Sequence, residues 1–231
     1  MENTISVLDK GYVRLINTMG TDLDVVNAAR VSFNKEVDTL SNNDTQLIDF
    51  LIKNKHDSVL RHCAMSFEIY APLMVARQWY KHAVGSSHVE EQLGWNESSR
   101  RYITEEPVFY TPDTFLLAAE NKKQGSAGFM SKGISQQFVE RLETLQSECM
   151  SVYNHALELG MAAEQARLFL PAYGMYIRWR WTVSLNALMH FLSLRKDISS
   201  QDEIQKYAKA VEIFVIGKFP ATAASWRVHR G

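Results

Sequence analysis

The sequence predicts an α+β fold in which a mixed antiparallel sheet is flanked by helices. Apolar and polar residues alternate over 63–71 and again over 176–183, a pattern typical of strands with one buried face. Apolar residues that recur every three or four positions over 135–160 predict a long amphipathic helix. The chain has 231 residues, of which 46% are hydrophobic, so we expect it to form one domain over residues 1–231.

Shorter patterns predict the remaining elements, and most of the helices begin at a residue that can cap one. Ser184 precedes an apolar stripe, so a helix is expected to follow the second of these strands. The glycine-rich stretch 121–133 is expected to be a flexible loop. In chain order the other expected elements are a strand over 11–20, a helix over 23–33 capped by Thr21 or Asp22, a helix capped within 42–44, a helix from Pro72 to His82, an extended piece over 107–112, a helix over 162–170, a helix that begins at Asp202 and a basic tail over 224–231.

The long helical stretch is expected to contribute to the core. Its stripe includes Cys149, which is therefore expected to be buried. Gly160 is expected to end the helix. The stripe consists of Phe138, Leu142, Leu145, Cys149, Val152, Ala156 and Leu159.

Composition excludes several classes of protein. The formal net charge of −1 provides no general field for nucleic acid or an anionic membrane. Two cysteines, without a spaced Cys/His quartet, exclude a disulfide framework and argue against a structural metal site. No apolar run approaches the roughly 18 residues of a membrane span, and no signal peptide is evident, so we expect a soluble cytoplasmic protein.

The polar segment 77–102 is the main candidate for a binding site, because it lacks the aliphatic residues that would drive its own burial. Arginine, serine and backbone N–H groups suit a phosphate, and amide or carboxylate side chains suit the edge of a base. Arg101, Arg167 and Arg195 could converge on one anion. Dinucleotide-binding and phosphate-loop glycine motifs are absent. The residues alone therefore indicate an α+β domain with a possible nucleotide site.

Five segments in order resemble the flavin-dependent thymidylate synthases, and the resemblance covers most of the chain from Ala28 to Tyr207. It implies the fold of that family, a homotetramer with active sites built by several subunits, and FAD at the interface. The segments are AARVSF, LRHCAMSFEIYAP, the pair ARQWYKH and NESSRRY, ARLFLP, and WTVSLNALMHFLSLR.

The resemblance also implies a reaction, the reductive methylation of dUMP to dTMP by an NADPH-oxidising methyltransferase. Methylenetetrahydrofolate supplies the carbon, and FAD reduced by NADPH supplies the hydride. This family uses no cysteine nucleophile, so catalysis depends on polarising the uracil ring. Arg195 matches the arginine that stabilises the developing negative charge and is the expected catalytic residue.

Matched positions carry the other expected roles. The dUMP-binding residues implied are Gln78, Glu97, Ser98, Ser99, Arg100, Arg101, Arg167 and Arg195. The FAD-binding residues implied are His62, Ala64, Lys81, His82, Ala83, Glu97, Ser184, Asn186 and His190. No metal is implied, and neither nucleic acid nor a membrane is expected as a partner.

The sequence departs from the family pattern around the flavin. The family triplet Arg-His-Arg is Lys81, His82 and Ala83 here, and Ser184 and Asn186 replace an asparagine and an arginine. Lysine keeps a charge without the bidentate fork, and alanine keeps neither. Residues 86–94 are surplus to the usual spacing. We therefore expect weaker FAD binding, unless a residue such as His88 or Arg100 compensates.

Two alternatives remain open from the sequence. One is a related flavin enzyme with different one-carbon chemistry, such as hydroxymethylation of a deoxypyrimidine monophosphate. The other is a non-catalytic relative that binds nucleotides or nucleic acid. The Lys-His-Ala triplet is the only feature that favours the latter, and the near-neutral net charge argues against it.

Overall fold

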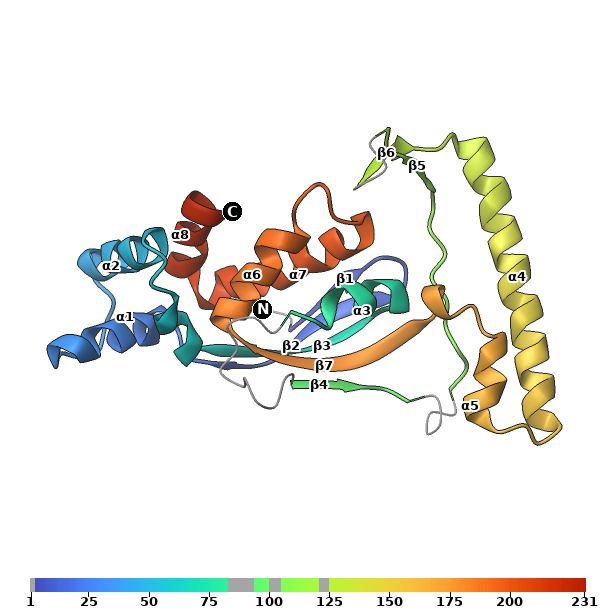
Figure 1. The fold of residues 1–231 in the computed structure, drawn as a ribbon, viewed down its shortest axis with the longest axis horizontal. Helices are drawn as coiled ribbons and strands as arrows, with labels where there is room; N and C mark the ends of the chain where they lie inside the picture. Colours follow the sequence, from blue (N-terminus) through green and yellow to red (C-terminus); the bar gives the residue numbers. More distant parts are fainter. Residues whose placement is uncertain (1–2, 83–93, 100–104, 121–124) are drawn as a thin grey trace.

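A computed structural model describes residues 3–82, 94–99, 105–120 and 125–231. Its main sheet has five strands in the order β1-β2-β3-β7-β4, and every neighbouring pair is antiparallel (Figure 1). Their bounds are Thr4–Val7 for β1, Gly11–Met19 for β2, Ala64–Pro72 for β3, Tyr176–Ser184 for β7 and Gly94–Glu97 for β4. The predicted antiparallel sheet is thus confirmed.

Helices cover one face of this sheet, and α3, α6 and α7 lie over the strands (Figure 1). A second group, α1, α2 and α8, packs together at one end of the sheet. The bounds are Asp22–Arg30 for α1, Asn42–Lys53 for α2, Leu73–Trp79 for α3, Leu185–Arg195 for α6, Asp202–Lys218 for α7 and Pro220–Arg230 for α8. Short 3-10 turns are η1 (Val31–Phe33), η2 (Asp57–His62), η3 (Arg167–Phe169) and η4 (Ala172–Gly174).

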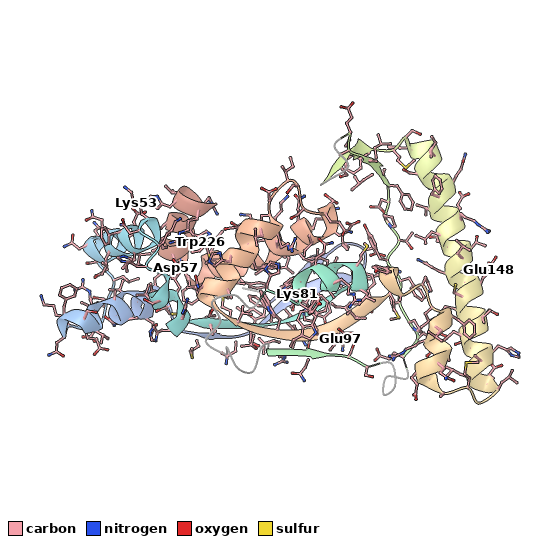
Figure 2. The ribbon with its side chains drawn as sticks, in the orientation of Figure 1. Lys53, Asp57, Lys81, Glu97, Glu148 and Trp226 are labelled. Carbon is pink, nitrogen blue, oxygen red and sulfur yellow. The ribbon has the colours of Figure 1, made fainter. Side chains whose placement is uncertain are left out.

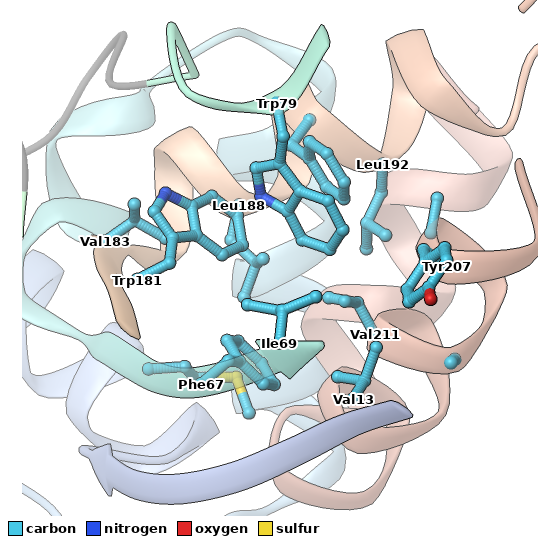
Figure 3. Packing of buried hydrophobic residues seen from close by; sticks show 14 of the residues in the cluster. Val13, Phe67, Ile69, Trp79, Trp181, Val183, Leu188, Leu192, Tyr207 and Val211 are labelled. Carbon is cyan, nitrogen blue, oxygen red and sulfur yellow. The ribbon is translucent and has the colours of Figure 1, made fainter. Parts of the chain in front are cut away.

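The core lies between the sheet and these helices, as the alternating strand patterns predict. Phe67 and Ile69 of β3 and Trp181 of β7 are fully buried, whereas Arg178 and Arg180 of β7 are exposed on the outer face. Figure 3 shows how the strand residues meet the helices. The labelled members are Val13, Phe67, Ile69, Trp79, Trp181, Val183, Leu188, Leu192, Tyr207 and Val211.

The long helix α4 (Lys132–Glu158) stands apart from this body, as Figure 1 shows. It packs against the short helix α5 (Ala163–Ala166) and η3, and it follows a hairpin of β5 (Leu116–Ala118) and β6 (Ser126–Phe129). Gly160, with φ of +84°, follows its end as predicted. Within the predicted flexible loop, residues 121–124 lie outside the described residues, and residues 126–129 form β6, so that prediction is wrong for β6.

The prediction that the α4 stripe belongs to the core is confirmed for Ala156 and, in a single chain, wrong for the four exposed members. Phe138, Leu145, Val152 and Leu159 are exposed by 53, 40, 48 and 75%. Cys149 is only half-buried. The reason is that α4 projects from the body and packs mainly against α5 and η3, while Phe138 also meets the Phe115 ring with centroids 5.9 Å apart.

Three other predictions of local structure also need correction. The second helix is capped by Ser41 in a capping box with Asp44, not from within 42–44. The helix predicted from Pro72 to His82 ends at Trp79, so His82 lies beyond the helix. The expected basic tail is the helix α8, whose N-terminus is held by Asp22, which accepts hydrogen bonds from Ala221 and Thr222.

In the part of the chain that the structure describes, no helix has both the length and the hydropathy to cross a membrane.

Candidate active site

An aromatic cluster fixes the end of α3 above the sheet. Trp79, the last residue of α3, stacks on Phe191 of α6 with ring centroids 4.5 Å apart. It also makes edge contacts with Trp179 and Trp181 of β7. Because all four rings are buried and interlocked, the residues that follow Trp79 start from a rigid position.

His82 and Arg195 meet at this position. Arg195, the last residue of α6, donates a hydrogen bond from Nε to Nε2 of His82 over 2.9 Å. The His82 ring also lies edge-on to Phe191, with ring centroids 5.1 Å apart. Burial, together with the positive charge of Arg195, lowers the pKa of His82 to about 4. At neutral pH the imidazole is therefore uncharged and can accept the hydrogen bond.

Gln78 is held by a residue that sequence reasoning missed. Its side-chain amide donates to Oε1 of Gln201, the residue that immediately precedes α7. Gln201 in turn contacts the sulfur of Met74 over 3.5 Å. The only sequence signal was that Gln201 precedes Asp202 at a predicted helix start, which says nothing about a contact with Gln78.

A cavity of about 1050 Å³ opens beside this contact. Met74 and Gln201 form one wall, residues 110–116 another, and Leu142 and Gln146 of α4 a third. His82 and Arg195 do not line it. This cavity therefore adjoins Gln201, the partner of Gln78, and is not lined by the proposed catalytic arginine.

Four of the predicted flavin residues meet at the other end of α6. Ala64 of β3 pairs in register with Ser184 of β7, and His62 is exposed just before β3. Ser184 caps α6 by accepting a hydrogen bond from the backbone N–H of Ala187 over 3.3 Å. Asn186 is buried, and its Oδ1 has no hydrogen-bond partner among the described residues. A buried acceptor left unpaired in the single chain suits a donor from a ligand or a second subunit.

His190, another predicted flavin residue, faces α8. Its ring lies edge-on to Trp226, with centroids 5.3 Å apart. The same face of α6 carries Ser193, which accepts a hydrogen bond from the Trp226 indole over 2.7 Å. His190 thus has a packing partner within the chain.

The β4 strand positions the described part of the polar signature. Trp95 stacks on Trp179 with ring centroids 4.9 Å apart, which holds β4 against β7. Ser98 donates from its backbone to the Arg178 carbonyl over 2.8 Å and accepts at Oγ from the Arg178 N–H over 3.1 Å. Figure 2 labels Lys81 after α3 and Glu97 on β4, and both residues are exposed in the single chain. Ser99 follows Ser98 and is half-buried.

Arg167 is not brought to Arg195 within one chain. It begins η3, next to α5, where its Nε donates to the Glu164 carbonyl over 3.2 Å. Figure 1 shows α5 and α6 in separate parts of the molecule. Ala83, Arg100 and Arg101 lie outside the described residues. Within one chain, therefore, Gln78, His82 and Arg195 lie near one another, whereas Arg167 lies in a separate part of the molecule.

Comparisons with known proteins show which family has this sequence and fold. The model of the family described as thymidylate synthase complementing protein matches residues 14–221. A flavin-dependent thymidylate synthase of Thermus thermophilus is 37% identical over 226 residues, which cover 98% of this chain and 79% of that protein. The enzyme of the same name from Thermosipho melanesiensis is 38% identical over 209 residues, which cover 90% of this chain and 87% of that protein.

A solved structure agrees with these matches. The UMP/dUMP methylase PolB from Streptomyces cacaoi, bound with 5-Br dUMP, superposes with a TM-score of 0.82 at 29% identity and with 97% of each chain covered. A fold of this kind, with the sequence matches above, defines a flavin-dependent nucleotide-methylating class of enzyme. The chain belongs to the flavin-dependent thymidylate synthase family.

Proposed function

We propose that this protein converts dUMP to dTMP, with methylenetetrahydrofolate as carbon donor, FAD as resident cofactor and NADPH as reductant. The observation that carries this proposal is the guanidinium of Arg195, held by a neutral His82 beside Gln78. A fixed cation at this point can donate to a pyrimidine carbonyl and N3 as negative charge develops there. FAD held here would supply the hydride, taken from NADPH, that the conversion of dUMP to dTMP requires.

The cysteines support a route without sulfur attack. Cys63 is fully buried, and burial raises the pKa of its thiol to about 12. A thiol with this pKa is not a thiolate at neutral pH and is a poor nucleophile. Cys149 lies on the projecting helix α4, away from His82 and Arg195. Activation of the pyrimidine therefore falls to charge and hydrogen bonding.

The described residues fit a flavin near the start of α6. The unpaired buried oxygen of Asn186 belongs to the first turn of α6, which follows Ser184, and Ser184 pairs with Ala64 of β3 two residues after His62. We propose that these residues, with Lys81, His82, Ala83, Glu97 and His190, hold FAD. We propose that dUMP is held by Gln78, Glu97, Ser98, Ser99, Arg100, Arg101, Arg167 and Arg195.

A homotetramer with shared sites is part of the proposal, and α4 supports it. Phe138, Leu145, Val152 and Leu159 recur every seven residues and are all exposed. A repeat of this length presents one continuous apolar stripe that suits packing against another helix. Because Arg167 and Arg195 are separated in one chain, a second copy would have to supply one of them. We place the assembly in the cytoplasm.

The reaction is tested without oxygen. Protein supplied with FAD, NADPH, dUMP and methylenetetrahydrofolate is expected to yield dTMP, identified by mass. Parallel reactions with UMP test whether the enzyme also accepts a ribonucleotide, because the similar solved structure is named for both nucleotides. In the reaction with dUMP, a product heavier than dTMP by one oxygen would indicate hydroxymethylation. If reduced FAD were present and no nucleotide product formed, the proposal would be contradicted.

We expect FAD affinity to be limited by the lost arginines. Ala83→Arg restores a charged donor in the matched triplet and is expected to tighten FAD binding about 10-fold, the value of one charge-assisted hydrogen bond. Titration followed by flavin fluorescence measures the change. Gln46→Arg, at an exposed position of α2, adds the same charge elsewhere and serves as the control. Equal FAD affinity in Ala83→Arg and the parent would show that the loss of charge does not matter.

A further inference from the structure

We propose that His82 is a positioning residue for Arg195, and that this role is separate from any contact with the flavin. The inference rests on the proposed function only in what Arg195 does once it is positioned. The hydrogen bond between the two side chains links residues 113 positions apart in the sequence.

The contact fixes the part of Arg195 that matters for orientation. A guanidinium is planar, so holding its Nε–H fixes the direction of the whole group. Nε donates to His82 over 2.9 Å, and the two terminal amino groups have no partner among the described residues. Arg195 is half-buried at the end of α6, where an unheld side chain of this length would sample many rotamers. The terminal amino groups thus remain available for a nucleotide.

His82 is itself held on several sides. Its backbone N–H donates to the Trp79 carbonyl over 3.0 Å, and Trp79 belongs to the interlocked aromatic cluster. Its ring lies edge-on to Phe191. The backbone of Gln78 lies close enough to the ring to oppose part of the fall in its pKa. Because Nε2 accepts from Arg195, the proton on the neutral ring is on Nδ1.

The environment keeps this hydrogen bond in place at working pH. The charged group that faces the ring from α6 is Arg195, and from α3 the ring meets the neutral backbone of Gln78. Burial and the Arg195 charge both lower the pKa of His82, to about 4. A protonated ring would have no acceptor for Arg195 and would repel it. The neutral ring is therefore the form that the surroundings select above about pH 5.

A simple packing histidine would need only the contact with Phe191, so two matched variants separate the roles. His82→Phe keeps a ring against Phe191 and removes the acceptor. His82→Gln offers an amide oxygen near the position of Nε2. With FAD saturating, His82→Phe is expected to lower kcat about 10- to 100-fold with little change in the KM for dUMP, and His82→Gln is expected to recover most of the loss.

The Arg195 background tests whether His82 acts through the arginine. In Arg195→Gln protein, adding His82→Phe is expected to cause no further loss, because the positioned group is already gone. A second loss equal to that seen in the parent would overturn the proposal. Full recovery of His82→Phe by excess FAD would also overturn it, because that result assigns the histidine to flavin binding.

A readout without turnover keeps this test independent of the reaction. The Nε–H of Arg195, observed by NMR with ¹⁵N-labelled arginine in nucleotide-free protein, is expected to exchange slowly with water in the parent and in His82→Gln. It is expected to exchange rapidly in His82→Phe. An unchanged signal in His82→Phe would refute the contact. Absence of dTMP from the parent would instead count against the proposed function, and the NMR result would still decide the contact.

Discussion

Arg195→Gln is expected to lower the rate of dTMP formation by about 10²- to 10³-fold, the usual effect of removing one donor that stabilises a developing charge. Glutamine keeps a polar side chain of moderate length but loses the cation and the planar fork. The effect should fall on kcat rather than on the KM for dUMP, because negative charge on the pyrimidine grows in the transition state. Single-turnover kinetics with prereduced FAD measure this step without contributions from NADPH binding.

Two further variants serve as controls for Arg195→Gln. Arg195→Lys keeps the charge, and we expect it to recover only part of the rate because an ammonium cannot donate as a planar fork. Arg227→Gln removes an exposed arginine on α8 that pairs with Glu212 over 3.5 Å, and it should retain full activity. If Arg195→Gln were as active as Arg227→Gln, pyrimidine activation would have to come from another residue. Melting temperatures and FAD content exclude unfolding as the cause.

The sheet and the helices over it were predictable because their patterns are local. Alternation in β3 and β7 places the apolar side chains on one face of each strand, and that face is the one that is covered. Phe67 and Trp181 are buried as expected. Ser184 caps α6 because a serine before an apolar stripe satisfies a free backbone N–H wherever the helix lies. Such signals depend on neighbours in sequence, so sequence alone carries them.

The α4 stripe shows the limit of the same reasoning. A period of three to four residues reports that one face of a helix is apolar, but it does not say whether the covering surface belongs to the same chain. Phe138 and Val152 fit a core and a subunit interface equally well by pattern. Only the projection of α4 from the body distinguishes them.

The site was predictable as a set of residues but not as a set of contacts. Resemblance assigned His82 to the flavin and Arg195 to the nucleotide, and gave no reason to join them. The hydrogen bond between them depends on α3 ending at Trp79, which places His82 in a turn beside α6. Gln201 was missed for a related reason, since its contact with Gln78 spans 123 residues.

Mixed assemblies of two inactive variants are expected to regain activity if sites are shared between copies. Arg167→Gln and Arg195→Gln should each be nearly inactive alone. In a random equal mixture, a site that takes Arg195 from one copy and Arg167 from another has both arginines about a quarter of the time. Co-expression with two affinity tags, followed by sequential purification, yields the mixed assemblies, and dTMP formation should reach about a quarter of the parent rate.

The α4 stripe provides the matched control for this experiment. Leu145 is 40% exposed, so Leu145→Glu does not place a charge in the core of the chain, but it does place one in the proposed helix interface. When Leu145→Glu is added to both arginine variants, we expect light scattering to show smaller assemblies, and we expect the mixture to regain no activity. Mixed assemblies that stay inactive while remaining tetrameric would mean that each site takes both arginines from one copy. In that case η3 and α6 of the same chain, which lie in separate parts of the molecule in Figure 1, would have to approach each other when the site forms.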